Sequence, residues 1–390
     1  MLVARLHGKG DLRLADEPVP EPGQGQPLVR VTAVGICGSD LHWWDEAGIG
    51  DAAVTDPLVL GHEAAGVIQD GPRRGERVAL DPAIWCGTCR PCRDGYRNLC
   101  TRIRFAGHGS QDGAMREYLT WPAHLLHPLP DGLTDADGAM LEPLGVALHA
   151  LDLGHVRLGA RVAVVGCGPI GLLLIQALRA AGARSVTAFD PLAHRRAAAL
   201  RAGAAQALDP AATGPADTSP AGTNPAGTNP AGTNPADTNP VDTNPADTGA
   251  DTNPVGARTA GLGTAGLETD ANLRDVIGDG VDVAFEIAGT DDAVRLAMRC
   301  ARPGGRVVLG GIPASDETSF PASLARRKGL TIAMVRRMND TYPRAIALAD
   351  SGVVSLTPLV TDTFRLADAA GALASAAARG GLKVIVEPRG

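Results

Sequence analysis

The middle of the chain alternates between short apolar runs and longer segments with helical periodicity. The run at 161–165 predicts a buried strand, and after a glycine turn apolar residues recur from Ile170 to Ala181 at spacings that place them on one helix face. The same alternation predicts strands at 185–189, 281–285 and 306–309 and a helix at 194–201. Strands that alternate with helices in this way form a parallel, doubly wound sheet. We therefore predict an α/β fold for this part of the chain.

The first part of the chain has a different pattern, in which short β-type runs are broken by glycine and proline. These runs lie at 28–34, 64–68 and 77–80. They predict a small, irregular, mainly β domain at 1–144.

The end of the chain returns to short elements. A helix is predicted around 344–349 and a final strand at 383–386. We expect the segment 336–390 to complete the first domain, which leaves 145–335 for the doubly wound domain.

A low-complexity insertion interrupts the second domain at 210–260. The 72 residues from Asp209 to Gly280 far exceed the roughly one dozen that a crossover between parallel strands needs. Proline recurs at every fifth position from Pro215 to Pro245, in a unit close to Ala-Gly-Thr-Asn-Pro. A repeat without an apolar face cannot stack into a core, and proline blocks helix continuation. We expect a disordered or turn-rich surface insertion.

Composition and charge exclude several classes of protein. The 390 residues suffice for two domains, and 44% of them are hydrophobic. A net charge of −7 argues against a nucleic-acid binder driven by bulk charge. The apolar runs are far shorter than the ~20 residues of a bilayer span, and the N-terminus lacks a signal-peptide core. We expect a cytoplasmic protein without nucleic-acid or membrane partners.

Four of the seven cysteines form a cluster with the spacing of a metal site. In a chain of cytosolic character a disulfide framework is not expected. Two Cys-x-x-Cys steps that share a cysteine, followed by a fourth thiol, are typical of tetrahedral zinc in a closed, structural site. The predicted ligands are Cys86, Cys89, Cys92 and Cys100. Cys167 and Cys300 are instead expected to be small buried apolar groups.

A glycine motif with full structural context indicates a dinucleotide site. It follows the strand at 161–165 and opens the helix, and Asp190 stands nineteen positions after its last glycine. A carboxylate there can accept hydrogen bonds from the ribose of NAD and repel a 2′-phosphate, although nearby basic residues leave NADP open. The predicted cofactor-binding residues are Gly166, Gly168, Pro169, Ile170, Gly171, Asp190 and Arg195.

Cys37 and His62 stand apart from these motifs. A lone cysteine and a lone histidine are commonly a core thiol and a hydrogen-bonded imidazole. Here both lie in glycine-flanked turns at strand ends, with polar or acidic neighbours that could orient them. A second metal site therefore remains open beside the ordinary structural interpretation.

Several segments resemble one family, the zinc-dependent medium-chain dehydrogenases, and within it the sorbitol (L-iditol 2-) dehydrogenase branch. The segments are GICGSDLHWW at 35–44, PLVLGHE at 57–63, YRNLC at 96–100 and EPL at 142–144. The resemblance covers the chain except for the 210–260 insertion. It implies a GroES-like catalytic domain, a Rossmann domain that binds NAD, and two zinc ions per chain, one catalytic and one structural. It also implies a homodimer or homotetramer.

The resemblance further implies roles for individual residues. Cys37 and His62 would bind the catalytic zinc, and the third ligand would be Glu63 or Glu142, with Glu63 favoured. Asp40 would orient His62. The remaining expected catalytic residues are Ser39 and His42 in a proton relay, Glu142 acting directly or through water, and Arg337 near the substrate.

The implied activity is oxidation of a secondary alcohol of a polyol or sugar alcohol, with NAD as hydride acceptor and a ketose-type product. Zinc with an open coordination position lowers the pKa of a bound oxygen acid, to about 7 for water in favourable sites. The segment 105–113 departs from the Ala-Thr-Pro-Pro sequence common in sorbitol dehydrogenases. A cyclitol, aminocyclitol, sugar acid such as idonate, vicinal diol or threonine therefore remains an alternative substrate. A different class, a catalytically silent NAD-binding interaction protein, is disfavoured by the intact Cys37, Ser39 and His62.

Overall fold

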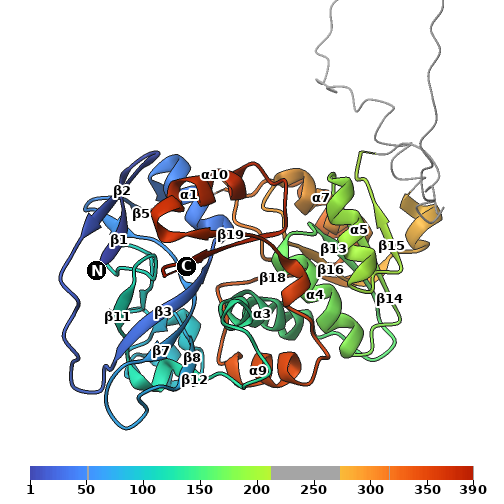
Figure 1. The fold of residues 1–390 in the computed structure, drawn as a ribbon. Coiled ribbons are helices and arrows are strands. Elements are labelled where there is room, and N and C mark those ends of the chain that lie inside the picture. The colour runs from blue at the N-terminus through green and yellow to red at the C-terminus, as the bar shows by residue number, and fades with distance from the viewer. Residues whose placement is uncertain (51, 212–272, 316, 390) are drawn as a thin grey trace, which may run out of the picture. The chain divides into compact units, whose positions relative to one another are not determined.

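A six-stranded parallel sheet forms the predicted doubly wound part of the protein. The computed structural model describes residues 1–390 except 51, 212–272, 316 and 390, so the expected insertion falls, from residue 212 onward, outside the described residues. The strand order β15-β14-β13-β16-β17-β18 reverses direction beside β13, the site of the glycine motif (Figure 1). The strands are β13 (Arg161–Val165), β14 (Ser185–Phe189), β15 (Gln206–Leu208), β16 (Val281–Glu286), β17 (Ala301–Leu309) and β18 (Thr331–Met334).

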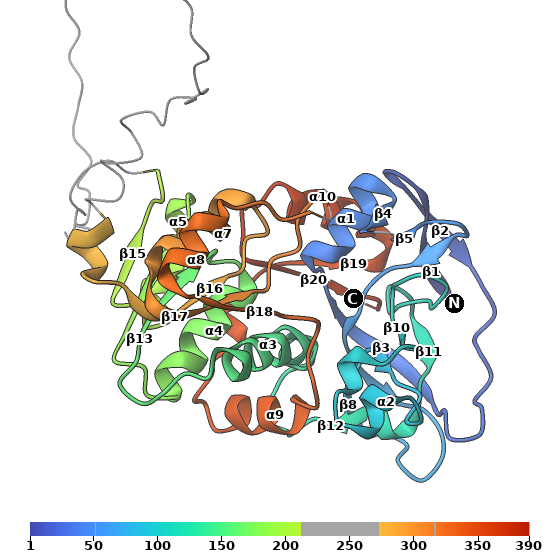
Figure 2. The ribbon, with the colours of Figure 1, turned by 180° about the vertical axis from the view of Figure 1, so that it is seen from behind.

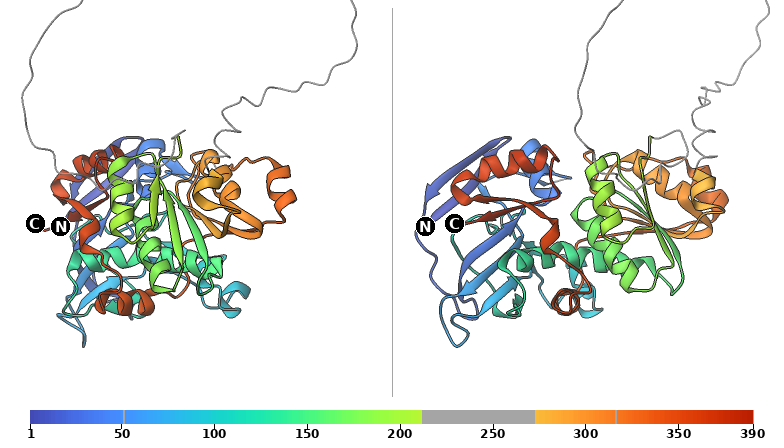
Figure 3. Two further views of the ribbon diagram at one scale, coloured as in Figure 1. Left: turned by 90° about the vertical axis from the view of Figure 1, so that its right-hand side faces the viewer. Right: turned by 45° about the vertical axis from the view of Figure 1, so that its right-hand side comes forward.

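Helices cover both faces of this sheet (Figure 3). Val162 and Val164 pack into one hydrophobic cluster, and Ala163 and Val165 pack into another. Because alternate side chains of a strand point to opposite faces, a strand buried on both faces carries the continuous apolar run seen in the sequence. The helices of this part are α4 (Pro169–Ala180), α5 (Ala193–Arg201), α7 (Asp291–Cys300) and α8 (Ala322–Lys328).

The predicted mainly β part contains a seven-stranded sheet in which the end of the chain takes part. Its order is β12-β8-β7-β3-β20-β19, and β11 also pairs with β3. Antiparallel pairing of β20 with β3 confirms that the final strand returns to the first part of the chain. The strands are β3 (Leu28–Gly35), β7 (Glu63–Ile68), β8 (Arg77–Leu80), β11 (Tyr118–Thr120), β12 (Leu126–Pro128), β19 (Val360–Arg365) and β20 (Lys383–Glu387).

Smaller sheets and helices complete this part. One sheet has the order β2-β1-β6, and β9 and β10 form a two-stranded pair, as do β4 and β5. The strands are β1 (Leu2–Gly8), β2 (Asp11–Asp16), β4 (Gly48–Ile49), β5 (Ala52–Ala53), β6 (Leu58–Val59), β9 (Ala83–Ile84) and β10 (Arg104–Phe105). The helices are α1 (Gly38–Glu46), α2 (Arg90–Arg93), α9 (Tyr342–Asp350) and α10 (Ala369–Ala377).

The long helix α3 (Asp135–Gly154) was not predicted from the sequence. Thr134 and Asp137 form a reciprocal cap at its start, which satisfies backbone N–H groups that a helix end leaves free. The helix continues through Pro143 and packs against β3, β7 and α4. It therefore crosses the predicted domain boundary at 144/145 and is packed against both large sheets. No helix in the described part of the chain is both long and apolar enough to cross a membrane.

Most predicted elements agree with the structure to within a few residues. β8, β13 and β14 have the predicted ends. β17 starts earlier than predicted, at Ala301, because Ala301 already pairs with Val281 of β16. α9 begins at Tyr342, ahead of the predicted start, because Pro343 in its first turn needs no hydrogen-bond partner.

Candidate functional site

Cys37, His62 and Glu63 form a cluster of metal-ligand type. One ligand atom from each lies within 4.8 Å of the others. Cys37 follows β3 at the start of α1, while His62 directly precedes β7 and Glu63 begins it. The antiparallel register pairs Gly35 with Glu63, which brings the two segments together. A thiol, an imidazole and a carboxylate are the ligands that zinc takes in catalytic sites.

Asp40 holds His62 from behind. Its carboxylate is fully buried, lies 3.5 Å from Nδ1 of His62, and accepts hydrogen bonds from the backbone N–H groups of Cys37 (2.9 Å) and Gly61 (3.1 Å). Burial opposes its charge, but His62 and these amides keep the pKa of Asp40 below its usual value. The contact to Nδ1 leaves Nε2 of His62 for a metal.

Glu63 has a partner that the sequence analysis missed. Its Oε2 contacts the ammonium group of Lys383, and both side chains are buried. Oε1 accepts no hydrogen bond from any described residue. A buried carboxylate oxygen without a partner is costly, so this atom fits a metal ligand. The signal for Lys383 was an isolated lysine in an apolar strand, in a chain with only three lysines.

Glu142 lies near this cluster but outside the group of three. It is 3% exposed on α3, and burial raises its pKa to about 7, with His62 lowering it and Glu63 raising it further. A carboxyl group with this pKa can hold or release a proton near neutral pH. The geometry therefore favours Glu63 as the third ligand and leaves Glu142 available for proton exchange.

The other expected catalytic residues lie in different surroundings. Ser39 Oγ lies 3.4 Å from Nε2 of His62, so these two are brought together. His42 instead lies 3.6 Å from the carboxylate of Glu46, one turn further along α1. These polar contacts of Ser39 and His42 are with other residues and not with each other.

Arg337 lies against Phe105, whose ring also neighbours His62. Its guanidinium is 4.1 Å from the centre of the Phe105 ring, and that ring is 5.3 Å from the His62 ring. Burial and then the charge of Arg336 lower the pKa of Arg337 to about 10, while Glu142 opposes the shift. Nη1 is buried without a hydrogen-bond partner among the described residues. Arg337 is therefore a partly buried cation that lies against the same ring as His62.

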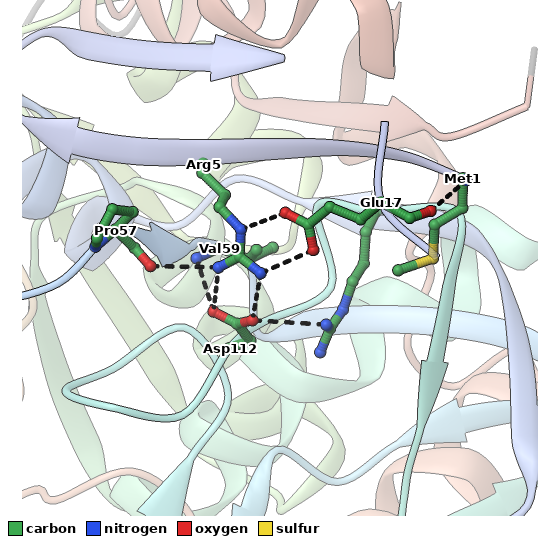
Figure 4. A network of polar contacts seen from close by, with 7 residues as sticks. Met1, Arg5, Glu17, Pro57, Val59 and Asp112 are labelled. Carbon is green, nitrogen blue, oxygen red and sulfur yellow. Dashed lines mark hydrogen bonds and ion pairs between the residues drawn. The ribbon is translucent and has the colours of Figure 1, made fainter. Parts of the chain in front are cut away.

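The segment 105–113 is anchored by Asp112. Figure 4 shows Arg5 held between Asp112 and Glu17; its Nη1 and Nη2 each donate to Asp112 at 3.0 Å. The same carboxylate accepts from the backbone N–H of Val59 at 3.1 Å. His108 of this segment meets the buried Trp43 edge-on at 5.3 Å. The network thus fixes a loop whose side chains lie against the metal cluster and α1.

The four clustered cysteines also come together. Their sulfur atoms lie within 4.8 Å of one another, and Cys89 Sγ is 3.4 Å from Cys92 Sγ. Backbone N–H groups point at the sulfurs, as in the hydrogen bond from Cys89 to Cys86 (3.4 Å). No disulfide joins any of the seven cysteines, and Cys167 and Cys300 are buried as predicted. The arrangement fits four-thiolate zinc with no position left for a substrate.

The glycine turn has the close packing that a dinucleotide site needs. Gly166 has a φ of +101°, and a Cβ there would meet the backbone of Ile287 and Ala288 at 2.9 Å. Gly168 and Pro169 begin α4, whose N-terminus attracts a phosphate. A Cβ on Gly171 would collide with the Gly166 carbonyl.

Asp190 and Arg195 lie beside this turn. Asp190 is 3% exposed at the end of β14. The guanidinium of Arg195 lies near Gly168, and burial lowers its pKa against the opposing effect of Asp190. Nε of Arg195 has no hydrogen-bond partner among the described residues. The predicted cofactor residues are therefore gathered in one place.

Comparisons with known proteins agree with this geometry. Residues 23–131 match the family described as alcohol dehydrogenase GroES-like domain, and residues 255–351 match the family described as zinc-binding dehydrogenase. Probable D-xylulose reductase A of Arthroderma otae is 32% identical over 98% of this chain and 95% of its own length. Sorbitol dehydrogenase of Bos taurus is 32% identical over 98% of this chain and 94% of its own length. The crystal structure of 2R,3R-butanediol dehydrogenase from Bacillus subtilis is 26% identical, with a TM-score of 0.76 over 100% of this chain and 99% of that one.

Proposed function

Because this chain belongs to the zinc-dependent medium-chain dehydrogenases, we propose that it oxidises a secondary hydroxyl of a polyol or sugar alcohol to a ketose-type product. The cofactors of the reaction are NAD and zinc. The observation that carries the proposal is the cluster of Cys37 with the buried His62 and Glu63, in which Oε1 of Glu63 lacks a hydrogen-bond partner among the described residues. When bound, zinc polarises the alcohol oxygen and the nicotinamide accepts the hydride.

The residues of the chain have separate tasks in this proposal. Cys37, His62 and Glu63 hold the catalytic zinc, and Asp40 fixes the orientation of His62. Ser39, 3.4 Å from His62, takes the proton of the alcohol. Glu142, whose pKa is about 7, exchanges a proton with the site near neutral pH.

The proton then needs a route to solvent. We assign His42, on the next turn of α1 and partly exposed, as the outer end of the relay. In this proposal Ser39 is the inner end and His42 the outer end of the relay, and a bound cofactor would supply ribose hydroxyl groups beside them. The contact of His42 with Glu46 supports a location at the surface end of the route.

The cofactor site and the four-cysteine site have roles other than binding the catalytic zinc. Gly166, Gly168, Pro169, Ile170 and Gly171 bring α4 to the pyrophosphate. Asp190 would accept hydrogen bonds from the ribose, and Arg195, which lies near Gly168, would bind the cofactor beside the glycine turn. Cys86, Cys89, Cys92 and Cys100 hold a structural zinc. We propose a catalytic domain at 1–144 and 336–390 and a cofactor domain at 145–335.

Arg337 favours a second candidate substrate, a sugar acid. Its Nη1 is buried without a partner, and a guanidinium binds carboxylates through paired hydrogen bonds. A polyol hydroxyl satisfies one N–H group, whereas a carboxylate also balances the charge. The two candidates differ only in whether an anionic group accompanies the reacting alcohol.

A substrate panel tests the proposal. The purified enzyme is assayed for NADH formation with polyols, cyclitols, vicinal diols, threonine and aldonic acids. We expect activity with polyols or aldonic acids. Arg337→Met should raise the KM of an aldonic acid far more than that of the matching polyol. NADH formation with none of these substrates, from enzyme that holds two zinc ions, would support a catalytically silent NAD-binding protein.

The edge of the parallel sheet supports a homodimer. β18, labelled in Figure 2, is an edge strand of the six-stranded sheet. Its Ile332 and Met334 are 36% and 67% exposed. An exposed edge with apolar side chains is a template for pairing with another strand. We propose that two copies pair through β18. Met334→Asp should then shift the protein to monomers in light scattering, and an unchanged mass would contradict this interface.

A further inference from the structure

A buried cation stands directly behind the proposed catalytic metal site. Lys383 is 2% exposed, and its ammonium group donates a hydrogen bond to the carbonyl of Ile36 at 2.9 Å. The same ammonium contacts Oε2 of Glu63. Burying a lysine is unfavourable unless the charge is paired, so the Glu63 carboxylate is its required partner.

The position of Lys383 follows from the pairing of the final strand. Lys383 opens β20, which is held in register with β3 through Ile385 and Gly35. The backbone N–H of Ile36 also donates to the carbonyl of Val384 at 3.0 Å. Lys383 therefore touches the backbone just before Cys37 and the side chain of Glu63. It bridges the two segments that carry the proposed ligands.

The Glu63 carboxylate has little room to move away from this pair. A Cβ on Gly35 would collide with Glu63 Oε2, so only glycine leaves space for the carboxylate. Oε1 has no hydrogen-bond partner among the described residues, and the ligand atoms of Cys37 and His62 lie within 4.8 Å of a Glu63 oxygen. One carboxylate thus lies between a fixed ammonium group and the metal cluster.

We propose that Lys383 is a positioning residue that shares the Glu63 carboxylate with the catalytic metal and weakens the hold of Glu63 on it. This inference rests on the proposed metal site. Two cations that compete for one carboxylate each receive less of its charge, so removing one of them strengthens the bond of the carboxylate to the other. The Glu63 carboxylate would accordingly neutralise less of the positive charge of a bound metal ion.

The zinc affinity of the catalytic site tests the proposal without any turnover measurement. Wild type and Lys383→Met are titrated with a chelator while the zinc of the four-cysteine site stays bound. Outer partners of metal ligands commonly change metal affinity by about 10–100-fold, so we expect Lys383→Met to bind zinc about 10-fold more tightly. The visible spectrum of the cobalt-substituted enzyme should change with it, because the carboxylate contributes more to the coordination.

Two variants serve as matched controls. Lys383→Arg keeps the positive charge and should retain a zinc affinity close to that of wild type. Lys328→Met removes a partly buried lysine, whose ammonium donates hydrogen bonds to the carbonyls of Met298, Arg299 and Ala301. It should leave zinc affinity unchanged. Equal zinc affinity and equal cobalt spectra for wild type and Lys383→Met would overturn the proposal.

A second pair of variants separates sharing of Glu63 from a simple charge effect. In a Glu63→Gln background there is no carboxylate to share, so adding Lys383→Met should change zinc affinity less than about 3-fold. Equal tightening in both backgrounds would overturn the sharing of Glu63. If Lys383→Met alone folds poorly, the double variant, which buries no unpaired charge, is compared with Glu63→Gln alone, and a zinc affinity about 10-fold higher in the double variant would overturn the sharing of Glu63. A wild-type protein with a single zinc per chain would instead refute the proposed metal site itself.

Discussion

Oδ2 of Asp190 accepts a hydrogen bond from the backbone N–H of Cys167 at 2.8 Å, inside the glycine turn. Oδ1 accepts a second bond from the N–H of Leu192 at 2.9 Å. The residue expected to select the cofactor therefore also fixes the shape of the turn. Each carboxylate oxygen can accept a further bond, so both tasks are compatible.

We predict that Asp190→Ala weakens both the binding of NAD and its selection over NADP. The change removes the acceptor for the ribose hydroxyls and the repulsion of a 2′-phosphate. Two lost hydrogen bonds to backbone N–H groups should also cost about 1–3 kcal/mol of folding stability. The measurement is steady-state kcat/KM with each cofactor. We expect kcat/KM for NAD to fall about 10-fold or more, and the ratio of kcat/KM for NAD to kcat/KM for NADP to fall as well.

Asp190→Asn provides the matched control. Its side-chain oxygen can still accept one of the two backbone bonds, but it no longer repels a phosphate. It should lose selectivity with a smaller loss of stability. A wild-type enzyme that already has a higher kcat/KM with NADP than with NAD would show that the cofactor assignment is wrong.

The parallel sheet could be predicted because its signals are local. Strand β13, the glycine turn and α4 follow one another within twenty residues, and each carries its own pattern. Helix α3 gave no such signal, since Gly138, Gly145 and Pro143 interrupt the usual helical composition. Its stability comes from packing against both large sheets, which no local window contains.

The candidate metal site likewise depends on contacts between residues far apart in the sequence. Motif resemblance indicated Cys37 and His62 and left Glu63 and Glu142 as alternatives for the third ligand, and it gave neither their burial nor their spacing. The contact of Glu63 with Lys383 joins residues 320 positions apart, and only the pairing of β20 with β3 brings them together. Sequence patterns predict which residues carry chemistry more readily than which distant residues hold them in place.

We predict two zinc ions per chain in the purified protein, because two separate ligand sets are present. Cys37→Ala should retain one zinc and lose most activity, since it removes a ligand of the catalytic site but leaves the four-cysteine lobe intact. Elemental analysis of both proteins checks this. A single zinc in wild type that persists in Cys37→Ala would remove the catalytic-zinc claim.

Cys89→Ser should act on stability instead. The loop around Cys89 has little apolar core of its own, so the metal supplies much of its folding free energy. We expect a lower melting temperature and loss of the structural zinc. Retention of both metals and of the wild-type melting temperature would contradict the structural role.

Asp81 gives a prediction about pH. Burial raises its pKa from 3.8 to about 6. The folded state therefore binds more protons than the unfolded state between these values, and this group makes the protein less stable as pH rises through about 4 to 6. Asp81→Asn cannot ionise, and its amide oxygen can still accept the N–H of Ala83. It should be more stable than wild type by up to about 2–3 kcal/mol at pH 8 and nearly equal at pH 4.

Asp282 is the matched control, because its pKa is shifted the other way. Burial opposes the shift, but the backbone N–H of Arg161 and the side chain of Arg302 lower the pKa of Asp282. Its stabilisation is present above the ordinary carboxyl pKa and is lost as pH falls. Asp282→Asn should therefore be less stable than wild type at pH 8. Denaturant unfolding at both pH values measures each variant, and a destabilised Asp81→Asn at pH 8 would contradict the argument.

Deleting residues 215–256 should leave the specific activity largely intact. The segment repeats proline at every fifth position, contains no cysteine or histidine, and offers almost no large apolar side chain for a core. It begins after the glycine turn and Asp190, so the cofactor residues remain in the shortened chain. The entropic cost of joining two fixed ends grows only by about 0.6 kcal/mol for each doubling of the length of chain between them, so we expect the deletion to change stability little. The measurement is turnover and zinc content of the purified variant. A folded variant that binds both metals but loses most of its turnover would show that the repeat takes part in catalysis or assembly.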